Sequence, residues 1–294
     1  MFDVDIDALW NYEDAAASER AFAALLDDAR LSEDVALRAE VLTQLARAQG
    51  LQRKFVQAHA TLDQAQAHID TGMTRPQIRL LLERGRVFNS SGNPNAARPY
   101  FQQALDLGVQ TGQDAYAIDA AHMLAIVAPS DQGEQALAWN ERALEMAEAS
   151  SNDKARRWLG SLYNNIGWTY HGMGRHVEAL AVFERALDWR IANRRDTRDD
   201  NPIRIARWSV ARALRSLGRV EDALVMQHAL IGELHAINER DGYVFEEIGE
   251  CLLHLGQAAE AKPYFAQAYA ELSKDDWFVT NEPARLQRLN DLSV

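Results

Sequence analysis

One sparse pattern recurs six times along the chain, and it limits the possible folds more than any other feature. Its clearest copy reads Gly167-x2-Tyr170-x3-Gly174-x4-Ala179-x3-Phe183-x2-Ala186. A small residue lets two helix backbones cross closely, and an aromatic residue fills the space beside the crossing. A helix pair of this kind cannot bury its apolar face alone, so consecutive pairs must stack on one another.

The other five copies differ in how many positions of the pattern they keep. Two of them are clear: Gly85, Phe88, Gly92, Ala97, Phe101 and Ala104, and then Gly249, Leu252, Gly256, Ala261, Phe265 and Ala268. Three are weaker: Ala46, Ala58, Leu62 and Ala65; Leu124, Val127, Ala136 and Ala143; and Ala211, Leu214, Gly218, Ala223 and Leu230. The first anchor of each copy stands at position 46, 85, 124, 167, 211 or 249, so successive copies lie 38 to 44 residues apart.

These spacings resemble the tetratricopeptide repeat (TPR) family, whose unit is a helix–turn–helix of about 34 residues. The longer period of this chain predicts longer second helices and longer connections between repeats. The resemblance covers roughly residues 36–273. It implies an all-α, right-handed α-solenoid of about six helix pairs, with a partial repeat before them and a capping helix after them.

Apolar periodicity and turn residues give the expected helix boundaries. First helices are expected at 33–49, 76–91, 113–128, 154–172, 202–217 and 241–255. Second helices are expected at 54–69, 95–110, 133–149, 176–194, 220–238 and 258–273. The sequence thus divides into an extended acidic segment (1–12), the solenoid with its partial first repeat (13–273), and a linker with a capping helix (274–294). In the capping helix, expected at 282–292, Leu286, Leu289 and Leu292 would cover the last repeat.

Composition excludes several classes of protein. The formal net charge is −12, which disfavours nucleic-acid binding, and residues 1–34 carry ten acidic and two basic side chains. The single cysteine, Cys251, allows no disulfide within the chain, as is typical of a reducing compartment. The N-terminus lacks the basic and apolar stretches of a signal peptide, and no apolar run reaches the roughly 18 residues of a membrane span. We therefore predict a cytoplasmic protein with no membrane partner.

No sequence signature of a catalytic or cofactor site is present. Phosphate-binding loops, dinucleotide fingerprints, nucleophile elbows and zinc-protease motifs are all absent. Cys251 is expected to be a buried structural thiol, and His171 and His176 are poorly spaced for a metal. The prediction is a protein with no enzymatic activity, cofactor or metal. The alternative is an enzyme that uses the carboxylates of Glu246 and Glu250.

In the TPR family the first helices line a concave groove, and the positions three before and one, four and five after each anchor point into it. Carried over to this chain, the resemblance implies these partner-binding residues: Arg47, Arg86, Asn89, Asn164, Trp168, His171, Trp208, Arg212 and Arg215. Arginine forks bind carboxylates, and arginine and tryptophan often dominate binding energy. The expected ligand is a protein or peptide with acidic and aromatic or apolar residues. Alternatively, Arg212 pairs with Glu250, and Trp168 packs on Trp208.

The predicted function is a protein- or peptide-binding scaffold or adaptor. A regulatory sensor that responds to a bound peptide or small molecule is the alternative. A chaperone-binding carboxylate clamp is not expected, because Leu82 and Ala121 stand where that clamp needs polar residues. The acidic segment at the N-terminus alternates apolar and acidic residues, as an Arg/Trp groove would prefer. We consider that it docks in its own groove, docks in that of a second copy to form a homodimer, or caps the first helices.

Overall fold

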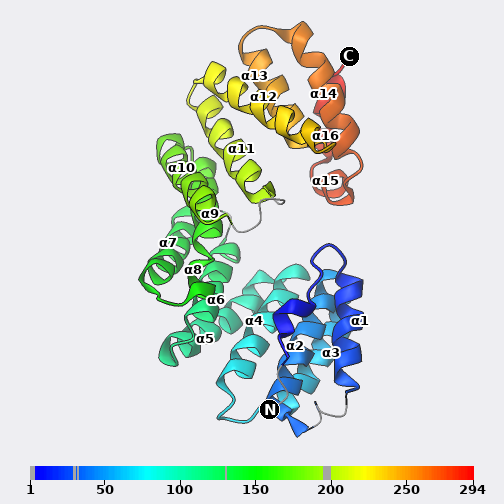
Figure 1. Cartoon of the computed structure of the whole chain (residues 1–294), viewed down its shortest axis with the longest axis vertical. Helices are drawn as coiled ribbons and strands as arrows, with labels where there is room; N and C mark the ends of the chain where they lie inside the picture. The colour runs from blue at the N-terminus through cyan, green and yellow to red at the C-terminus, as the bar shows by residue number, and fades with distance from the viewer. Residues whose placement is uncertain (1–3, 29–30, 32, 130, 195–199) are drawn as a thin grey trace. The chain divides into compact units, whose positions relative to one another are not determined.

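The six repeats fold as helices that pack in the order of the chain. The computed structural model describes residues 4–28, 31, 33–129, 131–194 and 200–294, and every regular element in these ranges is helical. The predicted fold class, an all-α repeat solenoid, is confirmed. The chain forms two compact units, residues 1–162 and 163–294. The colours of Figure 1, which run by residue number, identify the helices of each unit.

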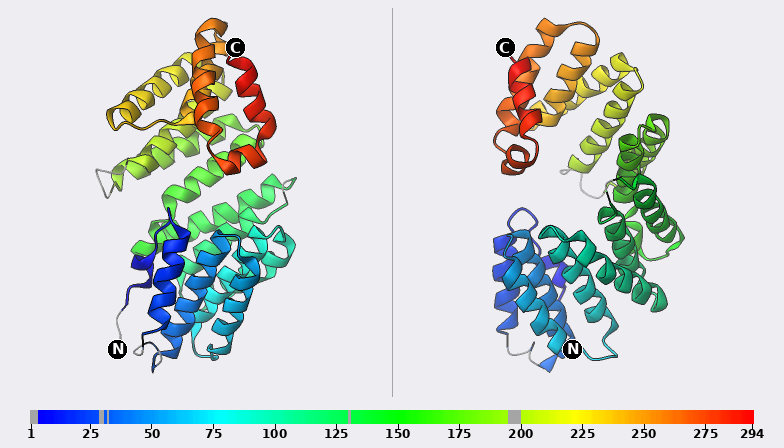
Figure 2. Two further views of the ribbon diagram at one scale, coloured as in Figure 1. Left: turned by 90° about the vertical axis from the view of Figure 1, so that its right-hand side faces the viewer. Right: turned by 180° about the vertical axis from the view of Figure 1, so that it is seen from behind.

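Unit 1 holds the partial repeat and the first three repeats. Its elements are η1 (Ile6–Leu9), α1 (Ala15–Leu26), α2 (Val35–Leu51), α3 (Phe55–Ala67), α4 (Thr74–Ser90), α5 (Pro94–Gln110), α6 (Asp114–Ile126), α7 (Gly133–Ala149) and α8 (Asp153–Arg156). The paired helices α2–α3, α4–α5 and α6–α7 pack on each other, and the first helices α2 and α4 lie side by side (Figures 1 and 2). This stacking buries the apolar face of each pair against the next.

Unit 2 holds the later repeats and the C-terminal end. The helix α9 (Leu159–Gly172) begins just before the boundary, and α10 (His176–Ala192), α11 (Asn201–Ser216), α12 (Val220–Ala236), α13 (Gly242–His254), α14 (Ala258–Leu272), α15 (Asp276–Asn281) and α16 (Pro283–Leu292) follow it. Helix α16 packs on α14 and buries Leu289 completely, with Leu286 and Leu292 partly buried beside it. The predicted capping helix is therefore present.

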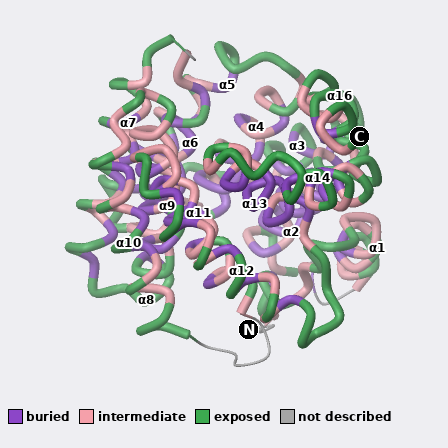
Figure 3. Tube along the Cα trace, turned by 90° about the horizontal axis from the view of Figure 1, so that it is seen from above, coloured by how far each residue is buried: buried purple, intermediate pink, exposed green. Residues whose placement is uncertain are grey.

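The anchor glycines lie where the pattern requires, at helix crossings. A Cβ atom placed on Gly85, Gly167 or Gly249 would lie 2.5, 2.4 or 2.7 Å from a ring atom of the aromatic residue sixteen positions later. Those rings belong to Phe101, Phe183 and Phe265, all fully buried. Figure 3 marks the buried stretches of the chain, among them those of α2 and α13. The pattern thus describes the core of each helix pair.

The structure differs from the sequence-based boundaries at two main places. The helix expected over 154–172 is broken at residues 157–158, where the Trp158 ring packs on His122 of α6 at a centroid distance of 5.6 Å. The expected linker after residue 273 contains α15, because the Asp275 side chain accepts hydrogen bonds from the backbone N–H of Trp277 (2.9 Å) and Phe278 (3.3 Å). Burial of the Phe278 ring then holds this short helix in place.

The N-terminal segment was expected to be extended, and part of it is not. Residues 6–9 form the 3-10 turn η1, whose N-cap Asp5 accepts a hydrogen bond from the backbone N–H of Asp7 at 3.1 Å. An aspartate in this position favours a local turn over a strand. The expected alternation also includes Phe2 and Asp3, which lie outside the described residues.

Candidate partner-binding surface

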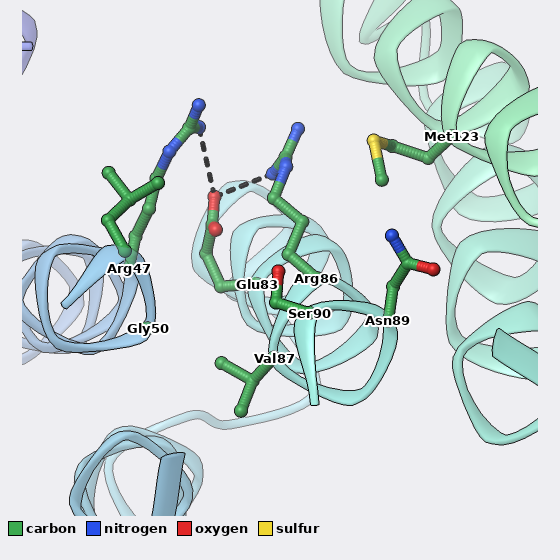
Figure 4. A pocket seen from close by; sticks show the side chains of 9 residues that line it. Arg47, Gly50, Glu83, Arg86, Val87, Asn89, Ser90 and Met123 are labelled. Atoms are coloured by element: carbon green, nitrogen blue, oxygen red, sulfur yellow. Dashed lines mark hydrogen bonds and ion pairs between the residues drawn. The ribbon is translucent and has the colours of Figure 1, made fainter. Parts of the chain in front are cut away.

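In unit 1, two predicted groove arginines converge on one glutamate. Arg47 of α2 and Arg86 of α4 reach the same carboxylate oxygen of Glu83, at 3.4 and 2.7 Å (Figure 4). Arg86 also donates to both carboxylate oxygens of Asp119 in α6, at 2.5 and 2.6 Å. The structure therefore brings Arg47 and Arg86 together through two acidic partners, Glu83 and Asp119, that lie between the helices.

Burial strengthens the attraction between the charges of this cluster, because water screens them little. The side chain of Glu83 is only 3% exposed. Burial alone would lower the pKa of Arg86, but attraction to Asp119 and Glu83 outweighs it and raises that pKa above its ordinary value. Arg86 is consequently a fixed cation that ties α4 to α6.

A pocket of about 200 Å³ opens beside this cluster. It is lined by Arg47, Gly50, Leu51, Glu83, Arg86, Val87, Asn89, Ser90 and Met123. Nε of Arg47 and Oε2 of Glu83 are buried, and neither has a hydrogen-bond partner among the described residues. Figure 4 shows Asn89 and Met123 across the pocket from Arg47. Arg47 and Asn89 therefore have hydrogen-bonding groups next to an accessible space.

In unit 2, the predicted tryptophans pack on each other. The rings of Trp168 and Trp208 are 5.5 Å apart, and Trp168 also lies 5.0 Å from the core ring of Phe183. Trp208 Nε1 donates to the backbone oxygen of Tyr243 at 3.2 Å, and Asn164 accepts a hydrogen bond from Ser209 at 3.4 Å. The alternative in which Trp168 packs on Trp208 is confirmed.

Arg212 and Arg215 share the buried carboxylate of Glu247. Arg215 makes a two-pronged pair with it, in which Nη2 lies 3.2 Å from Oε2, and Nε of Arg212 lies 3.6 Å from the same oxygen. The alternative pairing of Arg212 with Glu250 is wrong, because Glu250 pairs with Arg288 of α16.

The two carboxylates of the alternative enzymatic interpretation both have arginine partners. Arg285 of α16 donates to the oxygens of Glu246 at 2.7 and 2.6 Å, and Arg288 pairs with Glu250. The geometry assigns both glutamates a structural task, since they hold the capping helix onto α13.

His171 is a neutral hydrogen-bonding residue at neutral pH. Its Nε2 lies 2.9 Å from Oγ of Ser216, and its ring lies 4.7 Å from that of His176. Burial, together with the nearby charges of Arg212, His176 and Arg215, lowers the pKa of His171 to about 4. The predicted groove histidine therefore contributes no positive charge at pH 7.

We expect His171→Gln to flatten the pH dependence of stability below neutrality. The unfolded histidine has a pKa of 6.5 and the folded one a pKa of about 4, so the unfolded state binds the extra proton first. The contribution of His171 to the free energy of unfolding is therefore fully present above pH 6.5 and is lost as the pH falls toward 4. Melting temperatures of both proteins at pH 6.5 and pH 5 test this; equal decreases would contradict it.

A second pocket, of about 350 Å³, lies in unit 2. It is lined by Asn201, Arg204, Ile205, Trp208, Leu230, Leu234, Asp241, Tyr243 and Val244 from α11, α12 and the start of α13. Of these residues only Trp208 belongs to the set predicted from sequence. Arg204 escaped notice because it stands one turn before the family's inward positions.

Sequence reasoning also missed the acids that hold the arginines. Glu83 and Glu247 each stand two residues before an anchor glycine, Gly85 or Gly249. An acid at the same place in two repeats, 36 residues after Arg47 and 35 residues after Arg212, was the signal that could have found them.

The remaining chemistry of the described chain is limited. Burial raises the pKa of the Cys251 thiol to about 12, which keeps it protonated. No group of three or more His, Cys, Asp or Glu side chains in the described ranges could hold a metal ion. None of the described helices combines the length and the apolar character that crossing a membrane requires.

Two models of tetratricopeptide repeats match the sequence. One covers residues 78–155 and 163–274, more than half of the chain, and the other covers residues 129–192. No curated protein sequence matches the chain significantly.

Solved structures share the fold at low sequence identity. BtubC (BKLC) from P. vanneervenii superposes with a TM-score of 0.62 and 16% identity, over 81% of this chain and 94% of that one. A tetratricopeptide repeat protein from Parabacteroides merdae gives 0.55 and 16%, over 98% and 96%. A signal transduction ATPase with numerous domains from Pyrococcus horikoshii, which has a tetratricopeptide repeat sensor, gives 0.70 and 11%, over 94% and 41%.

Proposed function

The chain belongs to the tetratricopeptide repeat family, and we propose that it is a protein- or peptide-binding module with no catalysis of its own. Stacked repeats present extended surfaces suited to a partner segment. The observation that carries the proposal is the unit 2 pocket, where apolar walls and an incompletely paired arginine meet.

The unit 2 pocket has the size and lining of a binding site for an apolar side chain. Its volume of about 350 Å³ lies in the usual range of roughly 300 to 1,000 Å³ for ligand sites. Trp208 and Tyr243 provide aromatic walls, and Leu230 and Leu234 provide aliphatic ones. An aromatic or aliphatic anchor of a peptide would remove this apolar surface from water.

Arg204 adds a recognition element for an acid next to that anchor. Its side chain is mostly buried, and Nε has no hydrogen-bond partner in the described parts of the chain. Its ion-pair partner Glu239 lies 3.5 Å away and is 59% exposed, so the pair is weak and easily exchanged. A partner carboxylate that replaces Glu239 can accept charge-assisted hydrogen bonds from the Arg204 guanidinium.

The predicted site residues divide by role under this proposal. Arg47 and Asn89 line the unit 1 pocket and Trp208 lines the unit 2 pocket, so these three are the proposed partner contacts. Three of the other predicted residues form ion pairs with buried acids: Arg86, Arg212 and Arg215. The remaining three pack in unit 2 near Arg212 and Arg215: Asn164, Trp168 and His171. They shape the surface that the partner meets.

We expect Arg204→Gln to weaken binding of an acidic-aromatic peptide by about tenfold or more. A charge-assisted hydrogen bond contributes about 1.5–3 kcal/mol, and about 1.4 kcal/mol corresponds to a factor of ten. Peptides selected from a displayed random library against the protein would be measured by fluorescence anisotropy. The matched control is Arg207→Gln, because Arg207 is on the same helix but does not line the pocket.

Two outcomes would contradict the proposed site. Either the library yields no peptide that binds, or Arg204→Gln and Arg207→Gln weaken binding equally. A change in small-angle scattering on peptide binding would favour the sensor alternative over a rigid scaffold.

A further inference from the structure

The N-terminal segment lies across the first helices of unit 1. Ile6 is buried with Phe22 of α1 and Val41 of α2, and Leu9 packs at the edge of the same cluster. These apolar contacts alone would suit a cap on the partial repeat. The polar contacts of the segment extend much farther along the chain.

Asp7 reaches two cations from distant parts of unit 1. Its carboxylate accepts from Nη2 of Arg79 in α4 at 3.0 Å and from Nζ of Lys154 in α8 at 3.1 Å. Burial alone would raise the pKa of Asp7, but Arg79 and Lys154 outweigh it and hold that pKa below its ordinary value. Arg79 is itself held in position by Tyr116 of α6, whose hydroxyl oxygen accepts from Nε at 2.9 Å.

Trp10, three residues later, is bound through its ring and its N–H. Nε1 donates to the side-chain oxygen of Gln44 at 3.1 Å, and the guanidinium of Arg47 lies 5.4 Å from the ring centroid. The ring also packs in an edge-on arrangement with Phe22, at a centroid distance of 5.1 Å. Arg47 also lines the unit 1 pocket, so the segment contacts a residue of that pocket.

We infer that residues 6–10 are an intramolecular ligand of this surface, and that the partner segment it accepts carries a carboxylate followed three residues later by an aromatic ring. This inference rests on the proposed function, because it names the partner class and the regulation of the unit 1 surface. The surface is defined by Gln44, Arg47, Arg79 and Lys154. A partner must displace the segment to reach these side chains.

The segment is held loosely enough to be displaced. It contains one 3-10 turn of four residues, in which Ile6 alone is buried. The Asp7 carboxylate is 49% exposed and the Lys154 side chain 64% exposed, so salt weakens their attraction. A tethered segment competes at a high effective concentration, and its release raises the fraction of binding-competent molecules.

The test uses a labelled peptide of residues 1–12 as the probe, measured by fluorescence anisotropy. Three proteins are compared: the full chain, the chain from residue 13 onward, and full-length Asp7→Lys, which opposes Arg79 and Lys154. Glu13→Lys is the matched control, since it makes the same charge change at an exposed position. Amide exchange of residues 6–12 reports whether Asp7→Lys releases the segment.

We expect the truncated chain and Asp7→Lys to bind the probe about tenfold tighter than the full chain, and Glu13→Lys to bind like the full chain. Probes carrying Asp7→Lys or Trp10→Ala should bind at least about tenfold more weakly. If truncation unfolds the protein, Asp7→Lys still decides the matter.

Three binding results would overturn the inference: equal affinity in the full chain and Asp7→Lys when exchange shows release, no binding to the released surface, or no effect of the probe substitutions. A full-length dimer that becomes a monomer on truncation would overturn it too, because the segment would then occupy a second copy. A negative result in these experiments would not contradict the proposed binding site in the unit 2 pocket, because the Arg204→Gln experiment tests that site separately.

Discussion

Replacing Gly167 with leucine should destabilise the protein by about 1–3 kcal/mol or more, because the core at this crossing has no room. Even a Cβ atom there would lie 2.4 Å from Cε1 and 2.5 Å from Cδ1 of Phe183. The Phe183 ring is fully buried and packs on Trp168, so it cannot move aside without disturbing the next contact. Urea denaturation monitored by circular dichroism measures the loss.

Gly172→Leu is the matched control on the same helix. A Cβ atom at Gly172 meets nothing within 4 Å, and leucine favours a helix more than glycine does. This variant should be as stable as the wild type or slightly more so. Equal stability of Gly167→Leu and the wild type would show that the crossing yields easily, and the repeat pattern would then not describe the core.

The fold could be predicted because its determinants are local and repeated. Gly85, Gly167 and Gly249 each specify a helix crossing with an aromatic residue. The separation along the sequence is sixteen residues in all three pairs. The two errors in the boundaries lie outside this repeated pattern. One is the break at Trp158, whose ring contacts His122 of another helix, and the other is α15, which begins at the Asp275 cap.

The site could be predicted only in part, because its electrostatics depend on contacts between repeats. The family resemblance selected Arg47 and Arg86 as groove residues, but it gave no sign that both would pair with Glu83. Which acid meets which arginine depends on the offset between neighbouring first helices, as Arg212 shows by lying nearer Glu247 than Glu250. Arg204 faces a pocket that exists only once α11, α12 and α13 are packed.

Arg86→Met should cost about 3–5 kcal/mol, because it leaves buried acids without their main counterion. Asp119 would lose the guanidinium that now contacts both of its oxygens, and Glu83 would keep only the longer contact from Arg47 at 3.4 Å. Arg84→Met is the matched control on the same helix. Its partner Asp63 is 69% exposed, so that loss should be about 1 kcal/mol or less.

A second substitution separates lost charge pairing from lost packing. If the cost of Arg86→Met comes from an unpaired buried carboxylate, adding Asp119→Leu should recover a large part of the unfolding free energy. If the cost came from the arginine side chain as a packing element between α4 and α6, the second change would add its own loss. Recovery in the double variant would therefore identify the Arg86–Asp119 pair as the electrostatic link between the second and third repeats. Additive losses would assign that link to apolar packing and would free Arg86 to be considered a partner contact.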